Sequence, residues 1–489
     1  MKRTVHELGK LNWGKRVYAV VVLCAAAAIA LPAQTFTTLH SFDGTDGAGP
    51  LAPLAQATNG DLYGTTAGGG AYGYGGTVFK ITPSGTLTTL YSFCPSYPNC
   101  PDGYEPYAGL VQATNGDLYG ITMFGGADLY GPYGGTVFKI TPSGTLTTLY
   151  SFCAQKLCTD GESPDAGLVQ ATNGDLYGTT TYGGANGWGV VFRITPSGTL
   201  TTLYSFCSIS CTSGGNPNGL VQATNGDLYG TTLNFGARSG GTVFKMTPSG
   251  ALTTLYSFCS QSGCTDGAYP YAGLVQATNG DLYGTTSAGG ANGAGTVFKI
   301  TPSGTLTTLY SFSQACADGC HPGTGLIQAT NGDFYGTTSG GGANGNYGTV
   351  FKITPRGTLT TLYSFCSQSG CTDGQDPYGG LIQDTNGKFY GTTVLGGANG
   401  AGTVFSLSVG LGPFVKTLPT SGEVGAAVRI LGSDLTGATS VSFNGTAATF
   451  TVVSATEITT TVPPGATTGK VRVVTPRRTL SSSVFFRVP

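Results

Sequence analysis

The stretch that decides the fold is one copy of a repeat, residues 273–312, with the sequence GLVQATNGDLYGTTSAGGANGAGTVFKITPSGTLTTLYSF. It contains four short runs of apolar, β-branched and aromatic residues, Leu274–Ala277, Leu282–Thr286, Thr296–Thr301 and Thr305–Phe312. Asn279-Gly280 separates the first two runs and is a strong hairpin signal, because both central residues of that turn need positive φ. Pro302-Ser303-Gly304 separates the last two. Short strands with tight turns predict a four-stranded antiparallel meander.

The same unit recurs seven times along the chain. Its Thr-Asn-Gly turn is found at Asn59, Asn115, Asn173, Asn225, Asn279, Asn331 and Asn386, a period of 52 to 58 residues. A period of this size indicates a propeller or a solenoid. The units lack helical periodicity, which excludes helical and leucine-rich solenoids, and their regular hairpins disfavour a β-helix. Four-stranded units arranged radially form a β-propeller, in which most sheet edges are protected.

The two ends of the repeat array complement each other. First strands begin at Leu54, Leu110, Leu168, Leu220, Leu274, Leu326 and Leu381. The last unit reaches Gly402–Phe405 and then loses the pattern, whereas Thr35–Phe42 matches the fourth strand at Thr86–Phe93. We therefore predict an all-β fold in which residues 34–411 form a seven-bladed β-propeller closed by the N-terminal strand.

Three long words recur through the array, G-L-[VI]-Q-x-T-N-G-[DK]-[LF]-Y-G, G-T-V-F-K-I-T-P-S-G and T-L-T-T-L-Y-S-F. With these words the chain resembles the bacterial GloVer tandem-repeat family over residues 35 to about 408. The family is defined by its repeat, so the resemblance implies an exported repeat protein and brings no activity with it.

A different pattern occupies residues 412–489. Alternating segments separated by turns are expected at residues 419–422, 428–432, 441–445, 450–453, 458–463 and 471–474, and about seven strands in this length fit a small β-sandwich. The words Phe443–Ala448 and Val462–Gly465 resemble IPT/TIG domains, which have an immunoglobulin-like fold. The resemblance weakens at Arg477-Arg478, and it implies a spacer or interaction module.

Export is predicted from the N-terminus and from the cysteines. Residues 1–33 have a basic beginning, an apolar run over Val17–Ala30 and small residues after it, as in a cleaved secretory signal. Apart from Cys24, the cysteines fall into close pairs: Cys94/Cys100, Cys153/Cys158, Cys207/Cys211, Cys259/Cys264, Cys316/Cys320 and Cys366/Cys371. We predict six local disulfides and a secreted, cell-surface or periplasmic protein with no membrane span after signal cleavage. Zinc is disfavoured by the spacings and the scarcity of histidine.

Charge and composition exclude several classes of partner. Residues 34–412 hold ten Lys+Arg and nineteen Asp+Glu, a net charge of −9, whereas residues 413–489 have a net charge of +4. An acidic body is a poor nucleic-acid binder. The residues suggest no cofactor and no metal site, and they give no indication of oligomeric state.

The meander places constant turns at one end of each unit and variable loops, with all the cysteine pairs, at the other end. Variable loops on a rigid scaffold are where binding usually occurs. The residue after a proline that precedes each first strand is expected at the mouth of the central channel: Leu51, Tyr107, Asp165, Asn218, Tyr271, Gly323 and Tyr378. Glu105, His321, Asp376 and Trp188 are expected nearby. Aromatic and polar side chains of this kind suit a glycan or peptide, although the same residues could pack the loops against each other.

Two sets of aspartates are interpreted as structural. Those after the Asn-Gly turns (Asp61, Asp117, Asp175, Asp227, Asp281 and Asp333) are expected to bond locally, and Lys388 replaces the seventh. The Asp-Gly pairs of the cysteine loops favour turns over calcium. We assign no catalytic residue. The hypothesis is an exported, non-catalytic binding protein for an extracellular glycan or protein. The alternatives are a polysaccharide-cleaving enzyme using paired carboxylates from Glu105, Asp165 and Asp376, and a purely structural surface protein.

Overall fold

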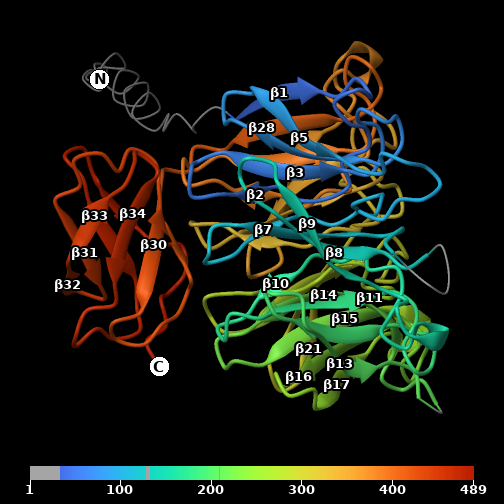
Figure 1. Cartoon of the computed structure of the whole chain (residues 1–489). Coiled ribbons are helices and arrows are strands. Elements are labelled where there is room, and N and C mark those ends of the chain that lie inside the picture. Colours follow the sequence, from blue (N-terminus) through green and yellow to red (C-terminus); the bar gives the residue numbers. More distant parts are fainter. Residues whose placement is uncertain (1–33, 128–132, 209) are drawn as a thin grey trace, which may run out of the picture.

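The computed structural model describes residues 34–127, 133–208 and 210–489. Over these residues the chain is all-β, with strands in two regions and three single-turn 3-10 helices, η1 (Lys156–Cys158), η2 (Ser262–Cys264) and η3 (Ser369–Cys371), in cysteine loops (Figure 1). None of the helices in these ranges is long and apolar enough to cross a membrane. The predicted signal segment and Cys24 lie outside the described residues.

The larger region contains seven four-stranded antiparallel sheets. Six follow chain order. The first three are β2 (Ala55–Gln56), β3 (Leu62–Thr66), β4 (Thr77–Ile81), β5 (Leu87–Ser92); β6 (Val111–Gln112), β7 (Leu118–Thr122), β8 (Thr136–Ile140), β9 (Leu146–Ser151); and β10 (Val169–Gln170), β11 (Leu176–Thr180), β12 (Val190–Ile194), β13 (Leu200–Ser205). The next three are β14 (Gly215–Gln222), β15 (Leu228–Asn234), β16 (Thr242–Met246), β17 (Leu252–Ser257); β18 (Val275–Gln276), β19 (Leu282–Thr286), β20 (Thr296–Ile300), β21 (Leu306–Ser311); and β22 (Ile327–Gln328), β23 (Phe334–Thr338), β24 (Thr349–Ile353), β25 (Leu359–Ser364).

The remaining sheet joins the two ends of the repeat region. Its strands are β26 (Ile382–Gln383), β27 (Phe389–Thr393), β28 (Thr403–Ser408) and β1 (Thr35–Ser41), with β1 antiparallel to β28 at the outer edge. The register pairs Thr35 with Ser408 and Ser41 with Thr403. The N-terminal strand therefore supplies the fourth strand of the last repeat, as its sequence predicts.

Within a repeat, a glycine in the second strand lets an aromatic ring cross it. A Cβ added at Gly284 in β19 would lie 2.7 Å from Phe298 Cζ and 2.8 Å from Leu274 Cδ2. Every residue of β19 is buried, and in β20 only Lys299 is partly exposed. The repeated Leu-Tyr-Gly-Thr-Thr and Thr-Val-Phe-Lys-Ile words are thus the two central strands of each sheet, and their side chains form the core.

The hydrophobic core is continuous from each sheet to the next. Tyr63 and Phe93 of the first sheet pack in one cluster with Phe138 of the second, and equivalent clusters link the following sheets. A further cluster contains Phe42 and Tyr390 of the last sheet together with Phe79 and other residues of the first sheet. Each sheet therefore packs against two neighbours, and the last sheet packs against the first.

A glutamine in each first strand adds a polar link between repeats. The Thr58 backbone N–H donates to Gln112 Oε1 of the next repeat at 3.0 Å, and the same bond recurs at Thr114, Thr172, Thr224, Thr278 and Thr330. The seventh bond runs from the Thr385 N–H of the last repeat to Gln56 Oε1 of the first, at 3.2 Å. Like the apolar clusters, these hydrogen bonds link each repeat to the next one along the chain and the last repeat to the first.

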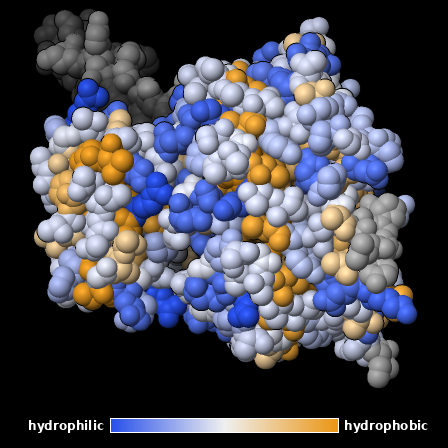
Figure 2. Space-filling model, viewed as in Figure 1, coloured by the Kyte–Doolittle hydropathy of each residue, from blue (hydrophilic) through white to orange (hydrophobic). Residues whose placement is uncertain are grey.

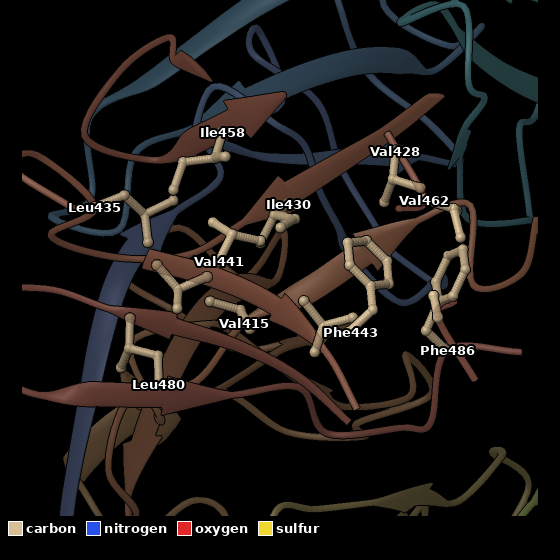
Figure 3. Packing of buried hydrophobic residues seen from close by; sticks show 13 residues of the cluster. Val415, Val428, Ile430, Leu435, Val441, Phe443, Ile458, Val462, Leu480 and Phe486 are labelled. Carbon is tan, nitrogen blue, oxygen red and sulfur yellow. The ribbon is translucent and has the colours of Figure 1, made fainter. Parts of the chain in front are cut away.

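The smaller region forms two four-stranded sheets around one apolar core (Figure 3). One sheet contains β29 (Lys416–Leu418), β30 (Ala427–Leu431), β34 (Glu457–Thr461) and β33 (Phe450–Val452). The other contains β32 (Thr446–Ala448), β31 (Ser440–Phe443), β35 (Val471–Val474) and β36 (Thr479–Ser481). Val441, Phe443 and Ile430 are among the buried side chains that fill the space between them.

One sequence expectation for this region was wrong. The segment at residues 419–422 is not a strand; the strand β29 ends at Leu418 instead. Pro419 has no N–H with which to continue the hydrogen-bond ladder, so the strand stops before it. The region has eight strands, close to the expected number of about seven, and β32 forms a short hairpin with β31.

The smaller region packs against the Thr-Asn-Gly turn end of the repeats, beside β2 and β3 in Figure 1. Arg429 Nη2 donates to Thr58 Oγ1 at 2.9 Å, and Thr456 Oγ1 donates to the Thr58 carbonyl at 3.0 Å. The partly buried Lys416 donates from Nζ to the Gln383 carbonyl at 2.7 Å and to Gln56 Oε1 at 3.1 Å. Burial lowers the pKa of Lys416 to about 8. The opposite end of the repeats, with the cysteine loops, stays open.

Candidate functional site

The central pocket lies at the start of the first strands, on the cysteine-loop side, and has a volume of about 480 Å³. All seven repeats contribute to its lining. The residue that follows the proline ahead of each first strand is present in every case: Leu51, Tyr107, Asp165, Asn218, Tyr271, Gly323 and Tyr378. The seven residues that the sequence predicts at a channel mouth, six side chains and Gly323, therefore line one cavity.

The pocket narrows where the first strands approach each other through glycine. A Cβ added at Gly273 would lie 3.0 Å from the Gly219 carbonyl oxygen, and one at Gly109 would lie 2.7 Å from the Pro53 carbonyl oxygen. Sequence reasoning did not assign a role to these glycines. The signal was present, because a glycine precedes the leucine of the first strand in six of the seven repeats. These glycines keep the inner strands close together.

Asp165 is the only carboxyl group in the lining of the central pocket. Its Oδ1 is buried and has no hydrogen-bond partner among the described residues. Burial raises the pKa of Asp165 to about 6, and a hydrogen bond with the Thr181 side chain opposes that rise. The group is therefore ionised at neutral pH although little of its charge is solvated.

Three tyrosines share the cavity with Asp165. Burial raises the pKa of Tyr271, and the negative charge of Asp165 raises it further. Burial also raises the pKa of Tyr107, followed by the charge of Glu105, to which its hydroxyl is hydrogen bonded. Tyr271 and Tyr378 remain 51% and 44% exposed, so their rings are available to a ligand.

Glu105, His321 and Asp376 do not line the central pocket. Each precedes a proline and has a positive φ, between 54° and 56°, which a non-glycine residue before proline rarely adopts. Their backbone N–H groups donate to loop carbonyls of the preceding repeat, at Gly75, Ala294 and Tyr347. These residues therefore fix the backbone just ahead of the pocket residues. Burial raises the pKa of Glu105 and that of Asp376.

Trp188 is also absent from the pocket lining. Its ring makes an edge contact with Phe235 of the next repeat, with the centroids 4.6 Å apart. Trp188 therefore packs one loop against another, which was the alternative to a role in ligand binding. Five of the nine predicted ligand-binding residues, Tyr107, Asp165, Asn218, Tyr271 and Tyr378, lie together in the pocket.

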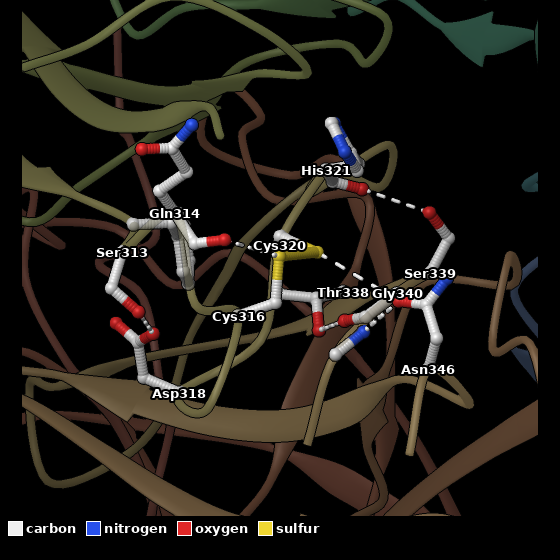
Figure 4. Close-up of a disulfide and its surroundings, with 12 residues drawn as sticks. Ser313, Gln314, Cys316, Asp318, Cys320, His321, Thr338, Ser339, Gly340 and Asn346 are labelled. Carbon is white, nitrogen blue, oxygen red and sulfur yellow. Dashed lines mark hydrogen bonds between the residues drawn. A yellow bond between two sulfur atoms is a disulfide. The ribbon is translucent and has the colours of Figure 1, made fainter. Parts of the chain in front are cut away.

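All six predicted disulfides are present, and each closes a loop within one connection between repeats. They are Cys94–Cys100, Cys153–Cys158, Cys207–Cys211, Cys259–Cys264, Cys316–Cys320 and Cys366–Cys371. Around Cys316–Cys320 (Figure 4), the Ser339 hydroxyl donates to the His321 carbonyl at 3.0 Å, and Asn346 Oδ1 accepts from the Gly341 N–H at 2.6 Å. The disulfide loops thus hold the segment that leads into the pocket.

The connection that contains Cys211 differs from its sequence expectation. The sequence predicts that the first strand of this repeat begins at Leu220, but β14 already begins at Gly215, soon after the cysteine. The prediction was wrong here because β15 is longer than the second strands of the other repeats, and its last residue, Asn234, pairs with Gly215. Cys211 is therefore correctly paired, but it ends a short loop close ahead of a strand instead of leading into a longer irregular segment.

The sequence model of the Gloeobacter/Verrucomicrobia repeat matches residues 27–170, 96–267, 132–331 and 260–453. The chain belongs to this repeat family. No curated protein matches it.

Solved structures resemble this Gloeobacter/Verrucomicrobia repeat chain only distantly. The extracellular domain of a protein described as a hybrid two-component system of B. thetaiotaomicron has 12% identity and a TM-score of 0.49, covering 89% of this chain and 52% of that one. A second such domain from the same organism has 12% identity and a TM-score of 0.47, covering 76% and 39%. A gluconolactonase of Xanthomonas campestris has 14% identity and a TM-score of 0.38, covering 78% and 92%. The chain thus spans only part of the first two structures.

The two sets of repeated aspartates make local contacts in this Gloeobacter/Verrucomicrobia repeat. The Asp281 backbone N–H donates to Asn279 Oδ1 at 3.1 Å, and Asp281 Oδ2 lies 3.6 Å from Lys299 Nζ. In the cysteine loops, Asp266 Oδ2 accepts from the Tyr256 hydroxyl at 2.8 Å and from the Ser260 N–H at 2.9 Å. Across the described ranges no cluster of His, Cys, Asp and Glu suited to a metal ion is found.

A cavity of about 640 Å³ also lies at the cysteine loop between the first and second repeats, lined by residues such as Tyr97 and Tyr104. Its lining comes from that connection and from residues soon after β7, whereas the central pocket draws on all seven repeats. On the side in Figure 2, hydrophobic residues are scattered singly or in small groups between polar ones, so that side offers no broad apolar patch. The central pocket is the better candidate for recognition.

Proposed function

We propose that residues 34–411 form a closed seven-bladed β-propeller and that residues 412–489 form an IPT/TIG-like domain. The propeller proposal is supported by the β1–β28 pairing, the core cluster shared by the last and first sheets, and the Thr385–Gln56 hydrogen bond. The IPT/TIG proposal is supported by two packed sheets in the part of the chain that carries the family's words.

The protein acts as an exported binding module, with the disulfides as the support for an oxidising location. Its ligand, a glycan or another cell-surface polymer, enters the central pocket from the cysteine-loop side. One observation carries this proposal: a single position of the repeat lines the cavity in all seven copies, yet its residue type varies from Leu51 to Tyr378. Variable positions on a rigid scaffold are where binding residues concentrate.

A glycan array and a pull-down with the exported, purified protein test the proposal. Replacing Tyr107, Tyr271 and Tyr378 together by alanine should abolish binding and leave the folded state intact, since Tyr271 and Tyr378 are half exposed. Replacing Asp117, Asp175 and Asp227 by alanine is the matched control, and should lower stability while binding persists. Binding that survives the tyrosine changes would place the site elsewhere. Polysaccharide cleavage stopped by Glu105→Gln or Asp165→Asn would replace the binding function by an enzymatic one.

A further inference from the structure

The lining of the central pocket contains no lysine, arginine or histidine. Its ionisable side chains are Asp165 and the three tyrosines, Tyr107, Tyr271 and Tyr378. A ligand in this cavity therefore meets one carboxylate and several aromatic rings, without any positive charge to bind an anion. The negative net charge of the repeat region, −9 over residues 34–412, acts in the same direction.

The Asp165 carboxylate has one buried oxygen, Oδ1, that lacks a hydrogen-bond partner among the described residues. A buried carboxylate oxygen normally accepts a hydrogen bond or faces a cation. Asp165 Oδ1 has neither among the described residues, and no cation lies among the pocket residues. The Thr181 side chain acts on the same carboxylate, but among the described residues Oδ1 is left for a group that a ligand brings into the pocket.

The tyrosines are distributed so that they enclose such a group. They come from the second, fifth and seventh repeats, and Asp165 comes from the third. All four residues line the same cavity of about 480 Å³. The negative charge of Asp165 contributes to the raised pKa of Tyr271, in keeping with that shared lining. Aromatic faces are electronegative and attract organic cations, most strongly when these are desolvated.

We propose that the central pocket recognises an organic ammonium group, a primary or methylated amine, held by the Asp165 carboxylate and the rings of Tyr107, Tyr271 and Tyr378. This inference rests on the proposed binding function. A divalent metal ion fits the site poorly, because it needs about six oxygen ligands and only one carboxylate is present. A neutral sugar would stack on the tyrosines but leave the carboxylate charge unmatched.

The test compares two tetrasaccharides that differ only at nitrogen: the glucosamine tetramer, which carries free amines, and the N-acetylglucosamine tetramer, which carries none. Choline is the third probe, as a bare ammonium. Titration calorimetry at physiological salt with the intact protein measures each affinity. We expect the amine probe to bind at least about 10-fold more tightly than its acetylated counterpart, because the acetyl group removes the charge that pairs with Asp165.

Variants distinguish amine binding in the pocket from non-specific attraction of amines by the net negative charge of the repeat region. Asp165→Asn keeps the shape and removes one charge, and should abolish the preference for the amine. Tyr271→Leu should weaken amine binding about 10-fold and Tyr271→Phe should change it less than about 3-fold, because phenylalanine keeps the ring. Tyr72→Leu is the matched control, since Tyr72 is 45% exposed and lies outside the pocket lining. If Asp165→Asn unfolds the protein, the Tyr271→Leu and Tyr271→Phe variants still show whether the amine binds in the pocket.

Each outcome has one meaning. Binding by choline but not by the glucosamine tetramer assigns an alkylammonium ligand and supports the proposal. Equal binding of both tetramers with no effect of Asp165→Asn overturns the ammonium proposal and leaves the pocket as a glycan site. Absence of binding by all three probes also overturns it, and the glycan array then tests the binding function separately. Amine binding that ignores every pocket variant contradicts both proposals.

Discussion

The two ends of the repeats use nearly the same backbone for different purposes. At the turn end, Thr-Asn-Gly recurs in all seven copies, its side chains bond to their own turn, and the C-terminal region rests on it. At the cysteine-loop end, the backbone is pinned equally firmly by disulfides and by bonds between repeats, yet the residue facing the pocket differs from copy to copy. The chain thus keeps the turn constant in all seven copies and varies the cysteine-loop end, including the position that lines the pocket.

If all seven sheets are equivalent, the same substitution should destabilise each of them equally, and a buried phenylalanine gives the largest expected loss of stability. Phe42 and Phe258 are both fully buried, one just after β1 and one just after β17, at equivalent places in the last and fourth sheets. Each change to alanine should lower the free energy of unfolding by about 3–5 kcal/mol, through lost burial and a cavity. Denaturant unfolding measures both. A silent Phe42→Ala beside a costly Phe258→Ala would mean that the N-terminal strand is not an integral part of the last sheet.

Removal of a disulfide should have the next largest effect. Replacing Cys259 and Cys264 together by alanine opens a loop of five residues' separation, and should cost about 2 kcal/mol in a chain-entropy account. Thermal unfolding of the double variant, with the untreated and reduced parent proteins as controls, measures it. The affinity of the double variant for a ligand of the central pocket should be unchanged, because the pocket residues of the other repeats are unaltered. A loss of affinity without a loss of stability would show that this loop itself forms part of the site.

The turn end should respond to the loss of one side chain by a smaller amount. Asn279 Nδ2 donates to the Tyr283 hydroxyl at 3.2 Å, and Asn279 Oδ1 accepts from the Asp281 N–H at 3.1 Å. Asn279→Ala should therefore cost about 1–2 kcal/mol of stability and leave ligand affinity unchanged. Tyr271→Ala is the opposite case, with a change in affinity and almost none in stability. If both variants lost affinity equally, the division of roles between the two ends would be wrong.

The smallest effect is the pH dependence from Asp165. Its pKa in the folded protein is raised from 3.8 to about 6, so the folded state holds the proton up to a higher pH than the unfolded state does. Stability from this group is full below about pH 4 and is lost as the pH rises through about 6. Asp165→Asn should be about 1 kcal/mol more stable than the parent at about pH 7.5, because the carboxylate borders an open pocket and part of its charge is screened. The two proteins should unfold alike at about pH 4.

Much of the fold followed from the sequence because its determinants are local. The strands around Asn279-Gly280 and the cysteine pairing depend on neighbours in sequence. The pairing of β1 with β28 is long-range, but it could be predicted because Thr35–Phe42 repeats the sequence of the fourth strands. Even the pocket residues could be named, because a fixed distance from a proline sets their place.

The remainder depends on contacts between repeats, which no single repeat specifies. The edge contact of Trp188 with Phe235 joins two variable loops, and the left-handed backbone at Glu105 and His321 is imposed by bonds to the preceding repeat. The docking of the C-terminal region also lacked a sequence signal, since Lys416 is one charge in an ordinary strand. Such features arise only once the sheets have packed.

Lys416 has a consequence for the symmetry of the whole molecule. Because the seven repeats are nearly identical, each of them offers the C-terminal region an almost equivalent contact surface. The last repeat removes this ambiguity: Asp384 stands where the other copies have alanine, and Lys388 stands where they have aspartate. The Lys416 ammonium reaches the carbonyl of Gln383 beside them and the side chain of Gln56 in the first repeat. These two replacements distinguish the last repeat from the others, so each copy of the pocket position, such as Tyr107, Asp165 or Tyr271, has its own fixed place relative to the C-terminal region.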